Sequence, residues 1–397
     1  MRALHRWLVL AVIAAGSAVA CTSILGIDTL TNGPEKLDAT KQDMTAPDTT
    51  PLPPTCTPFH PPSPPDAGDD GGGTSFTLAT SAIVLAMDQP DKADIYYDLD
   101  NQCTCDIPDA ESCVRPLNGG QPLSDTCDLS NGRDGTGNRA IALLTNVQSI
   151  KESTLEANVT AGQYGLVISV RGYNGLPDDP QVRVDVARSY GTVEVNGVTT
   201  PLKKDGNDPW TYEPKTATDD GKLITSVYFD ANAYVHDSVL VAHLPVLVVN
   251  IQLLADKSNN HNQISLRLVD VTVTGTVGVS DAGPGLMLSE GRGVGRISAS
   301  DLTKTLSVWN DPLDMSQGIC VGSPLFSTLI GKICERLDLR TNASEDSKGL
   351  PCNAMSFGIG FTATPAKVAG PKPFQFAKTT CFDGTADPAV PGTFACP

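Results

Sequence analysis

The sequence predicts a mainly β fold: an antiparallel, jelly-roll-like β-sandwich with a small disulfide-rich C-terminal part that contains one helix. Three observations lead to this prediction. Apolar runs are short or alternate with polar residues, and clusters of Gly, Asp and Asn separate them. Only one long stretch has clear helical periodicity. Five of the 11 cysteines fall in the last 78 residues.

The strand signals lie in the middle of the chain. Apolar and polar side chains alternate over residues 182–186, and the run 164–170 is typical of a buried strand. β-branched residues on both sides of Asn196-Gly197 predict a hairpin, because this dipeptide adopts the tight turn that matches strand twist. Pro245 interrupts the apolar run 239–254, which therefore predicts two strands or one bent strand.

One strand is expected to contain a β-bulge. Leu266 and Leu268 share one face by alternation, whereas Val271 and Val273 continue with the opposite parity. A shift of one residue inside a strand indicates an extra residue, which we place near Val269-Asp270.

Glycine patterns predict two further local structures. The Gly-x-Gly-x-Gly repeat over residues 291–295 is interpreted as a tight turn between strands, since no βαβ pattern around it favours nucleotide binding. Residues 357–361 predict a returning strand in which every second side chain faces the core and the glycines between them allow close backbone approach. The core-facing residues are Phe357, Ile359 and Phe361, and the glycines are Gly358 and Gly360.

The helical signal is confined to two places. Ser323-Pro324 is an N-cap residue followed by a proline at the first helical position. Apolar residues then recur at helical spacing through Arg336, which predicts an amphipathic helix that carries Cys334. Ser300-Asp301 marks the start of a second, short helix.

Residues 1–20 are typical of an export signal. A basic start precedes an apolar stretch of 14 residues, 7–20, which is shorter than the ~20 residues of a membrane-spanning helix. Small residues lead into Cys21 as in a bacterial lipobox, although an ordinary signal-peptidase site fits the same residues. We expect lipidation of Cys21 and, because Thr22 rather than Asp follows it, an outer-membrane location.

A tether is expected between this anchor and the folded part. Ten of the 30 prolines lie between Pro34 and Pro65, and Asp and Gly follow them. Such a composition cannot bury enough apolar surface to offset chain entropy, so residues 21–75 are predicted to be disordered. Residues 76–310 are then assigned to the sandwich, and residues 311–397 to a cysteine-rich segment packed on it.

The cysteines predict a disulfide framework. With Cys21 lipidated, ten thiols remain, an even number that can pair in an oxidising compartment. Zinc is the competing interpretation of Cys103-x-Cys105, but the one-residue spacing suits a structural zinc site poorly. On an extended segment these two point in opposite directions, which favours different partners, and the other pairings stay open. The candidates are Cys56, Cys103, Cys105, Cys113, Cys127, Cys320, Cys334, Cys352, Cys381 and Cys396.

Two stretches rich in Asp, Asn and Gly, 98–101 and 131–138, form a candidate calcium site. Calcium takes roughly six to eight oxygen ligands from carboxylates, amides and carbonyls. Neither stretch has the EF-hand layout, and the same residue types are common in turns, so turn chemistry is the competing interpretation. No cofactor is assigned apart from this candidate calcium, whose candidate ligands are Asp98, Asp100, Asp134 and Asn138.

The net charge and one aromatic-acidic motif bear on which ligands the protein could bind. With 28 Lys+Arg against 45 Asp+Glu, the net charge of −17 argues against nucleic acid as a partner, because phosphates demand positive charge. Glu213 beside Trp210 and Tyr212 offers a place for a sugar to stack or for carboxylate catalysis, and an ordinary strand is the competing interpretation. No catalytic residue is assigned.

Three stretches resemble a group of uncharacterised secreted lipoproteins that are abundant in myxobacteria. They are residues 21–28, residues 97–138 around the first cysteine cluster, and residues 351–363, which read Pro-Cys-Asn-Ala-Met-Ser-Phe-Gly-Ile-Gly-Phe-Thr-Ala. The resemblance covers about residues 85–397. It implies an envelope location and no known activity.

We therefore expect a cell-envelope lipoprotein that serves as a non-enzymatic binding or structural surface module. Its expected partners are the membrane, through the N-terminal lipid, and an unknown envelope or extracellular ligand. The alternative is a carbohydrate-binding, calcium-dependent β-sandwich module, and a secreted hydrolase is the third hypothesis.

Replacing Cys21 by Ser is expected to abolish lipidation, because the acylated glyceryl group is attached through the thiol. Cells fed an alkyne analogue of palmitate should label the wild-type chain and not Cys21→Ser, as measured by in-gel fluorescence. Ser23→Ala is the matched control and should keep the label. A wild-type chain that takes up no label would contradict the lipoprotein prediction.

Overall fold

The computed structural model describes residues 56–66, 72–86, 94–105, 111–148, 151–195, 198–199, 201–252, 263–306, 309–311, 314–374, 378–382 and 394–396. The chain divides into two compact units, Met1–Leu52 and Pro53–Pro397, and every described residue belongs to the second. The predictions of the export signal, of Cys21 and of most of the tether lie outside the described residues.

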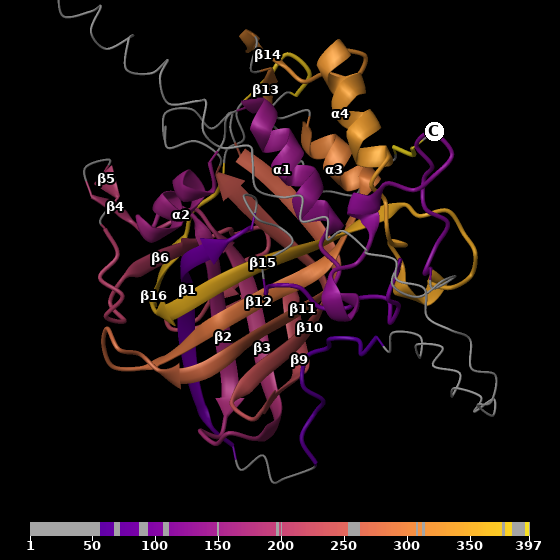
Figure 1. Ribbon diagram of the computed structural model, residues 1–397. Helices are drawn as coiled ribbons and strands as arrows, with labels where there is room; N and C mark the ends of the chain where they lie inside the picture. Colours follow the sequence, from indigo (N-terminus) through magenta and orange to yellow (C-terminus); the bar gives the residue numbers. More distant parts are fainter. Residues whose placement is uncertain are drawn as a thin grey trace, which may run out of the picture. The chain divides into compact units, whose positions relative to one another are not determined.

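Eight antiparallel strands form one sheet that closes on itself as a barrel (Figure 1). Consecutive barrel strands along the chain pair with each other, and the last one, β15, closes the barrel by pairing with β1. The strands are β1 (Thr74–Val84), β2 (Gly165–Tyr173), β3 (Asp179–Ser189), β9 (Tyr228–His236), β10 (Val239–Gln252), β11 (Gln263–Val279), β12 (Leu286–Ser298) and β15 (Ala354–Pro365).

The predicted mainly β, antiparallel body with a disulfide-containing C-terminal part is confirmed. The sheet is continuous, so the two faces that the sequence assigns to a sandwich are opposite walls of one barrel. The part assigned to residues 311–397 supplies β15 to the barrel wall, so it is built into the body as well as packed on it.

Helices and short strands fill the connections between the barrel strands. Helices α1 and α4 contact each other, as do α3 and α4, and Figure 1 shows the three beyond one end of the barrel. The helices are α1 (Thr136–Gln148), α2 (Glu152–Thr160), α3 (Ala299–Leu306) and α4 (Pro324–Cys334), with 3-10 turns η2 (Ser124–Thr126), η3 (Ser130–Gly132) and η5 (Ala343–Glu345). The short strands are β4 (Glu194–Val195), β5 (Val198–Thr199), β6 (Pro209–Tyr212), β7 (Ala217–Asp219), β8 (Ile224–Ser226), β13 (Asn310–Asp311), β14 (Asp314–Gly318) and β16 (Lys367–Pro371).

Several predicted local structures are confirmed. Strands β4 and β5 pair antiparallel, as the predicted hairpin requires, although residues 196–197 between them lie outside the described part. Helix α4 begins after Ser323, whose side chain accepts a hydrogen bond from the backbone amide of Phe326 at 3.1 Å. The second, short helix is α3, where Ser298 Oγ accepts from the amide of Asp301 at 3.0 Å. Among the described residues, no helix is both long and apolar enough to cross a membrane.

The predicted bulge in β11 is also confirmed. The pairing of β11 with β12 shifts register between Val269 and Thr272, and Asp270 has a φ of 51°. The shift explains the change of parity, because Leu266 and Leu268 are buried before it and Val271 and Val273 after it. The apolar run that contains Pro245 forms one strand, β10. Only Val239–Val241 of β10 pair with β9, so the proline, which has no backbone N–H, interrupts no hydrogen bond between these two strands.

The interpretation of the glycine repeat at residues 291–295 as a turn is wrong, because these residues lie inside β12. A Cβ on Gly291 would lie 2.6 Å from the Phe361 ring, and one on Gly295 would lie 2.9 Å from Val271. Gly291 and Gly295 are needed where β12 passes large side chains of the strands beside it, whereas a Cβ on Gly293 would meet nothing within 4 Å. Two of the three alternate glycines therefore indicate close packing rather than chain reversal.

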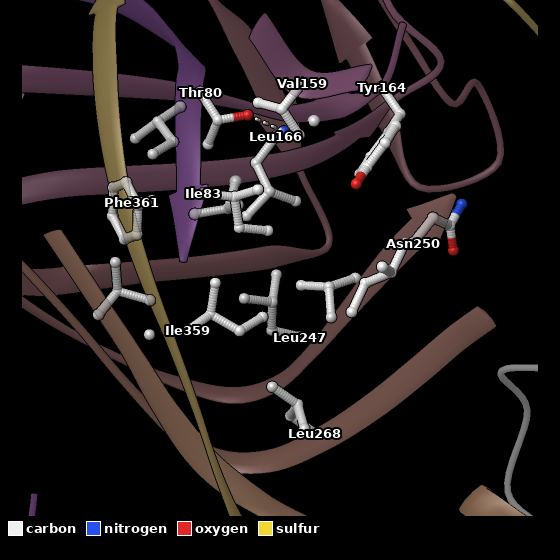
Figure 2. A pocket seen from close by; sticks show the side chains of 17 residues that line it. Thr80, Ile83, Val159, Tyr164, Leu166, Leu247, Asn250, Leu268, Ile359 and Phe361 are labelled. Carbon is white, nitrogen blue, oxygen red and sulfur yellow. Dashed lines mark hydrogen bonds between the residues drawn. The ribbon is translucent and has the colours of Figure 1, made fainter. Parts of the chain in front are cut away.

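Apolar side chains fill the barrel (Figure 2). Leu247, Leu268, Ile359 and Phe361 project inward from β10, β11 and β15, and a cavity of about 40 Å³ remains between the walls. A cavity of this size admits at most a few water molecules, whereas sites for organic ligands measure about 300–1,000 Å³. The interior is therefore a packed core, and a ligand site has to be sought outside it.

The returning strand β15 has the predicted faces. Phe357, Ile359 and Phe361 are 0%, 7% and 7% exposed. Between them, a Cβ on Gly358 would lie 2.6 Å from the Tyr96 ring, and a Cβ on Gly360 would lie 2.7 Å from Ile95. The glycines therefore allow the segment with Ile95 and Tyr96 to pack directly on the backbone of β15.

Gly358→Ala is expected to lower the free energy of unfolding by about 1–3 kcal/mol, since overpacking forces side chains and backbone apart. Gly293→Ala in β12 is the matched control, because a Cβ there meets nothing within 4 Å, and it should change stability by less than about 1 kcal/mol. Chemical denaturation with both variants measures the difference. Equal effects would contradict the packing of Tyr96 on β15.

Candidate metal centre

Ten cysteines pair into five disulfides, which confirms the predicted framework. Cys103 and Cys105 have different partners, as expected from their spacing. Of the five cysteines in the last 78 residues, Cys352 is the one that pairs with a cysteine outside this stretch, Cys113. The pairs are Cys56–Cys103, Cys105–Cys127, Cys113–Cys352, Cys320–Cys381 and Cys334–Cys396.

The Cys56–Cys103 bond fastens the end of the predicted tether to the body. The amide of Phe59 donates to the carbonyl of Asn131 at 3.0 Å, and Tyr234 Oη donates to the carbonyl of Pro62 at 2.5 Å. Residues 56–66, assigned to the tether from composition, therefore lie along the barrel. Their apolar rings and their backbone groups find partners there that the composition alone does not reveal.

Three of the four candidate calcium ligands converge. Carboxylate oxygens of Asp98, Asp100 and Asp134 lie within 4.8 Å of one another, and the three residues are 5%, 6% and 1% exposed. Two contacts bring these three residues together. Tyr96, which precedes Asp98 and Asp100, packs on the backbone of β15. The amide of Asp134 then donates a hydrogen bond to the carbonyl of Tyr97 at 3.0 Å, which joins the second loop to the first.

In two of these carboxylates one oxygen is bound to the backbone and the other is not. Asp98 Oδ1 accepts from the amides of Asp100 at 3.0 Å and Asn101 at 2.6 Å, and Asp134 Oδ2 accepts from the amide of Leu99 at 2.7 Å. Asp98 Oδ2 and Asp134 Oδ1 are buried and have no hydrogen-bond partner among the described residues. Buried polar atoms are nearly always paired, so these two oxygens make the cluster a candidate cation site.

Glycine at position 132 is needed for the two loops to meet. It has a φ of 69°, and a Cβ there would lie 2.5 Å from Asp98 Oδ2 and 2.6 Å from the Gln102 carbonyl oxygen. The η3 loop therefore approaches Asp98 as closely as a backbone can. Gln102 adds a carbonyl oxygen, a ligand type that calcium accepts, next to the unpaired carboxylate oxygen.

The fourth candidate, Asn138, is engaged elsewhere. Its Nδ2 donates to the carbonyls of Leu85 and Gly358, each at 2.7 Å, and its Oδ1 accepts from the amide of Gly358 at 2.8 Å. The side chain thus holds the start of α1 to β15, and its oxygen is already bound.

Two aspartates that the sequence analysis did not single out extend the acidic cluster. Asp128 accepts from the amide of Thr104 at 2.7 Å, and Asp338 accepts from the amide and hydroxyl of Ser356 at 3.1 and 2.7 Å. Asp128 follows a disulfide cysteine and Asp338 follows α4. Neither lies in an Asp- or Gly-rich motif, so sequence spacing offered no signal for them.

Burial raises the pKa of these carboxyl groups, and the negative charge of Asp100 adds to the effect. The pKa of Asp98 is raised to about 7, that of Asp128 to about 8 and that of Asp338 to about 6. The pKa of Asp134 is raised well above its usual value for the same reasons. No Lys or Arg in the described part forms an ion pair with these groups or with Asp100, and the one guanidinium that attracts Asp134, that of Arg296, interacts more strongly with Asp346 and Asp270.

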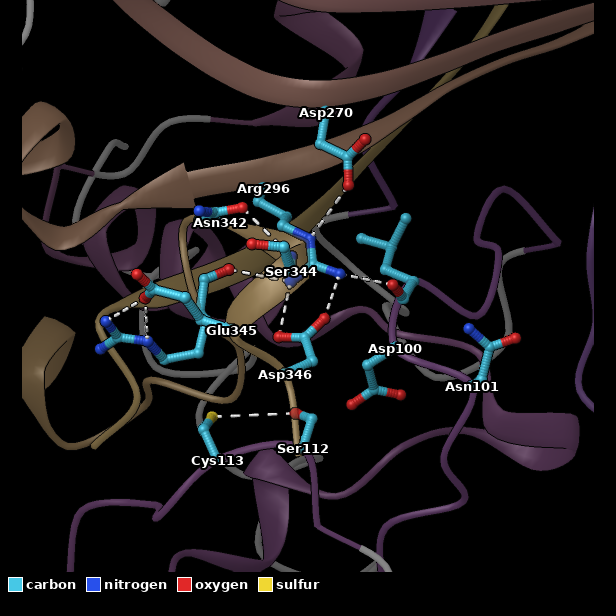
Figure 3. A network of polar contacts seen from close by, with 12 residues as sticks. Asp100, Asn101, Ser112, Cys113, Asp270, Arg296, Asn342, Ser344, Glu345 and Asp346 are labelled. Carbon is cyan, nitrogen blue, oxygen red and sulfur yellow. Dashed lines mark hydrogen bonds and ion pairs between the residues drawn. The ribbon is translucent and has the colours of Figure 1, made fainter. Parts of the chain in front are cut away.

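The nearest guanidinium has partners of its own (Figure 3). Arg296 on β12 is fully buried and binds both carboxylate oxygens of Asp346 at 3.0 and 2.7 Å, and its Nε lies 3.5 Å from Asp270. Its Nη2 also donates to the carbonyl of Leu99. Arg296 therefore fixes the loop between Asp98 and Asp100, while its charge is balanced by Asp346 and Asp270.

The other residues considered from sequence do not form an accessible site. Trp210, Tyr212 and Glu213 are 2%, 4% and 3% exposed, and Glu213 accepts from the amides of Lys215 and Phe374 at 3.2 Å each. These side chains belong to the packing of β6 on the barrel. The place suggested for a sugar or for catalysis is thus covered by the protein itself.

A second group of potential ligands, Asp178, His236 and Asp237, differs in its surroundings. The side chain of Asp237 is 86% exposed. His236 Nδ1 contacts the carbonyl of Ser63 at 2.7 Å. Solvent can satisfy these groups without a cation, so this group serves as a control for the buried one.

Without divalent cations, the melting temperature should fall as pH rises from about 5 to 8. A carboxyl whose pKa is raised on folding stabilises the fold most below its unfolded pKa of 3.8, and this stability is lost as pH passes through folded values of about 6 to 8. Scanning calorimetry in chelator tests this. The fall should be smaller with millimolar calcium, and a rising melting temperature in chelator would contradict the uncompensated cluster.

No protein-family model, no curated protein and no solved structure matches this chain.

Proposed function

We propose that this chain is a lipid-anchored cell-envelope module that binds calcium and uses it to hold a binding surface in place. The observation that carries the proposal is the pair of buried, unpartnered carboxylate oxygens, Asp98 Oδ2 and Asp134 Oδ1, beside Asp100. The export signal and Cys21 support the envelope location, and the five disulfides fit an oxidising compartment.

The chemistry of the donors favours calcium over transition metals. The available ligands are carboxylate and carbonyl oxygens, which hard cations prefer, and no His or Cys joins the buried group. Three carboxylates within 4.8 Å repel one another strongly when buried, and a divalent cation would offset that repulsion. Calcium also accepts irregular coordination more readily than magnesium, which suits ligands drawn from two loops.

The proposed role is binding rather than catalysis. The carboxylates of the cluster are buried. In both Asp98 and Asp134, one carboxylate oxygen accepts hydrogen bonds from backbone amides of the loops. Such a cation orders the loops that it joins. We therefore propose that the cation holds the loops 94–105 and 130–134, and the surface that they form, in a fixed position.

Asp134→Asn separates this proposal from a purely structural hydrogen-bond role. The amide keeps the shape of the carboxylate and removes a buried negative charge. In chelator the variant should be at least as stable as the wild type, and it should lose the stabilisation by calcium. For the wild type, calcium at about 100 times its Kd should add about 2.7 kcal/mol, measured as a shift in melting temperature.

Asp237→Asn, in the exposed acidic group, is the matched control and should keep the full calcium shift. A wild-type chain whose melting temperature does not respond to calcium would overturn the proposal. If calcium raises the melting temperature of Asp134→Asn as much as that of the wild type, the calcium site lies elsewhere in the chain.

A further inference from the structure

We propose that a groove next to the cation site binds one ring of a neutral saccharide and that this binding depends on the cation. The inference rests on the proposed function, because it names the ligand class of the surface that the cation is proposed to hold. The groove measures about 300 Å³, the lower end of the range for organic ligands. Its walls include Phe59, Pro62, Tyr97, Thr274, Glu290 and Arg292.

The groove combines aromatic surface with fixed polar groups. Phe59 stacks on Tyr97 with ring centroids 5.4 Å apart, and the guanidinium of Arg292 lies 5.5 Å from each ring. At the base, Tyr97 Oη and Thr274 Oγ1 are 3.0 Å apart, and Arg292 Nη1 donates to Tyr97 Oη at 3.3 Å. These contacts hold the polar groups in place before a ligand arrives.

A sugar ring matches this combination. It has a face of C–H groups that packs on an aromatic or proline ring, and a rim of hydroxyls that both donate and accept hydrogen bonds. Phe59 and Pro62 are half-buried and offer the apolar surface, while Thr276 and Glu290, which line the same groove, offer oxygens. The C–H face and the hydroxyl rim of one ring would therefore meet complementary surfaces.

The balance of charge around the groove selects a neutral ligand. Arg133 and Arg292 both pair with Asp94, and Glu290 supplies a second carboxylate. Two positive and two negative groups leave no net charge to attract an anionic polymer or a polyamine.

The groove and the cation site share a backbone. The amide of Asp98 donates to the carbonyl of Phe59 at 2.9 Å, and the amide of Asp134 donates to the carbonyl of Tyr97 at 3.0 Å. Both aromatic residues of the groove are thus hydrogen-bonded to residues that would bind the cation. Repulsion among the carboxylates in the absence of the cation would displace the loops that carry these rings.

The test uses the full-length chain, purified in detergent, on an array of neutral oligosaccharides (cello-, xylo-, manno-, malto- and chito-oligosaccharides) with uronic-acid oligosaccharides and peptides as comparators. Calorimetric titration of the best neutral ligand then measures its affinity in calcium and in chelator. The wild type should bind a neutral oligosaccharide in calcium, and chelator should weaken binding at least about tenfold.

Phe59→Ala should weaken saccharide binding about tenfold while the calcium shift in melting temperature is kept, because its side chain is no cation ligand. Glu290→Gln, at an exposed position, is a second variant that preserves shape and should also weaken binding. Phe229→Ala on β9 removes another exposed aromatic ring, 41% exposed, and should bind like the wild type.

The outcomes separate the two proposals. A chain that responds to calcium but binds no neutral oligosaccharide overturns the saccharide inference alone. Preference for uronic acids or peptides overturns it as well, and so does equal binding by Phe59→Ala and the wild type. A chain that binds a saccharide equally in calcium and chelator, with no calcium shift, overturns the cation proposal and the coupling between the sites.

Discussion

Both the closed barrel and the acidic cluster depend on strand β15. Its inner face closes the barrel through Phe357, Ile359 and Phe361, and its outer face is bare at Gly358 and Gly360. Ile95 and Tyr96 pack on that bare backbone, Asn138 binds the amide and carbonyl of Gly358, and Ser356 binds Asp338. The acidic cluster thus has its position because the loops that form it dock on the strand that also completes the sheet.

Docking in this way concentrates negative charge in a buried space. The carboxylates of Asp98, Asp100 and Asp134 converge. Asp128 and Asp338 help to raise the pKa of Asp134, and the charge of Asp100 helps to raise their own pKa values. The charge of Arg296 is already paired with that of Asp346. Buried like charges are costly unless a proton or a cation relieves them. If the proposed cation site is the function of this cluster, the buried carboxylates lower stability for its sake, as functional clusters commonly do.

Local features were predictable where a few neighbouring residues determine the structure. The bulge at Asp270, the pairing of β4 with β5 and the cap at Ser323 follow from parity, turn chemistry and capping, and all three are found. The set of paired cysteines followed from their number. The Asp- and Gly-rich stretches also indicated three of the clustered aspartates before their contacts were known.

Features that depend on distant residues were not predictable. Barrel closure requires β1 to pair with β15, far along the chain, and no periodicity records that choice. The same holds for the pairing of Cys113 with Cys352 and for Asp128 and Asp338. From sequence, the aromatic neighbours of Glu213 suggest either a place for a sugar or an ordinary strand. Only the tertiary structure decides between them, because β6 pairs with β16 and the side chains of Trp210, Tyr212 and Glu213 are buried.

The Cys56–Cys103 bond has a mechanical consequence for a chain anchored at its N-terminus. Tension along the tether would enter the body at Cys103, three residues after Asp100, and would bypass β1. From there it would pass back through residues 98–102, which carry Asp98 and Asp100, to Tyr96, which packs on Gly358 of β15. A cation held between this loop and Asp134 would act as a clamp that stiffens the connection between anchor and barrel wall.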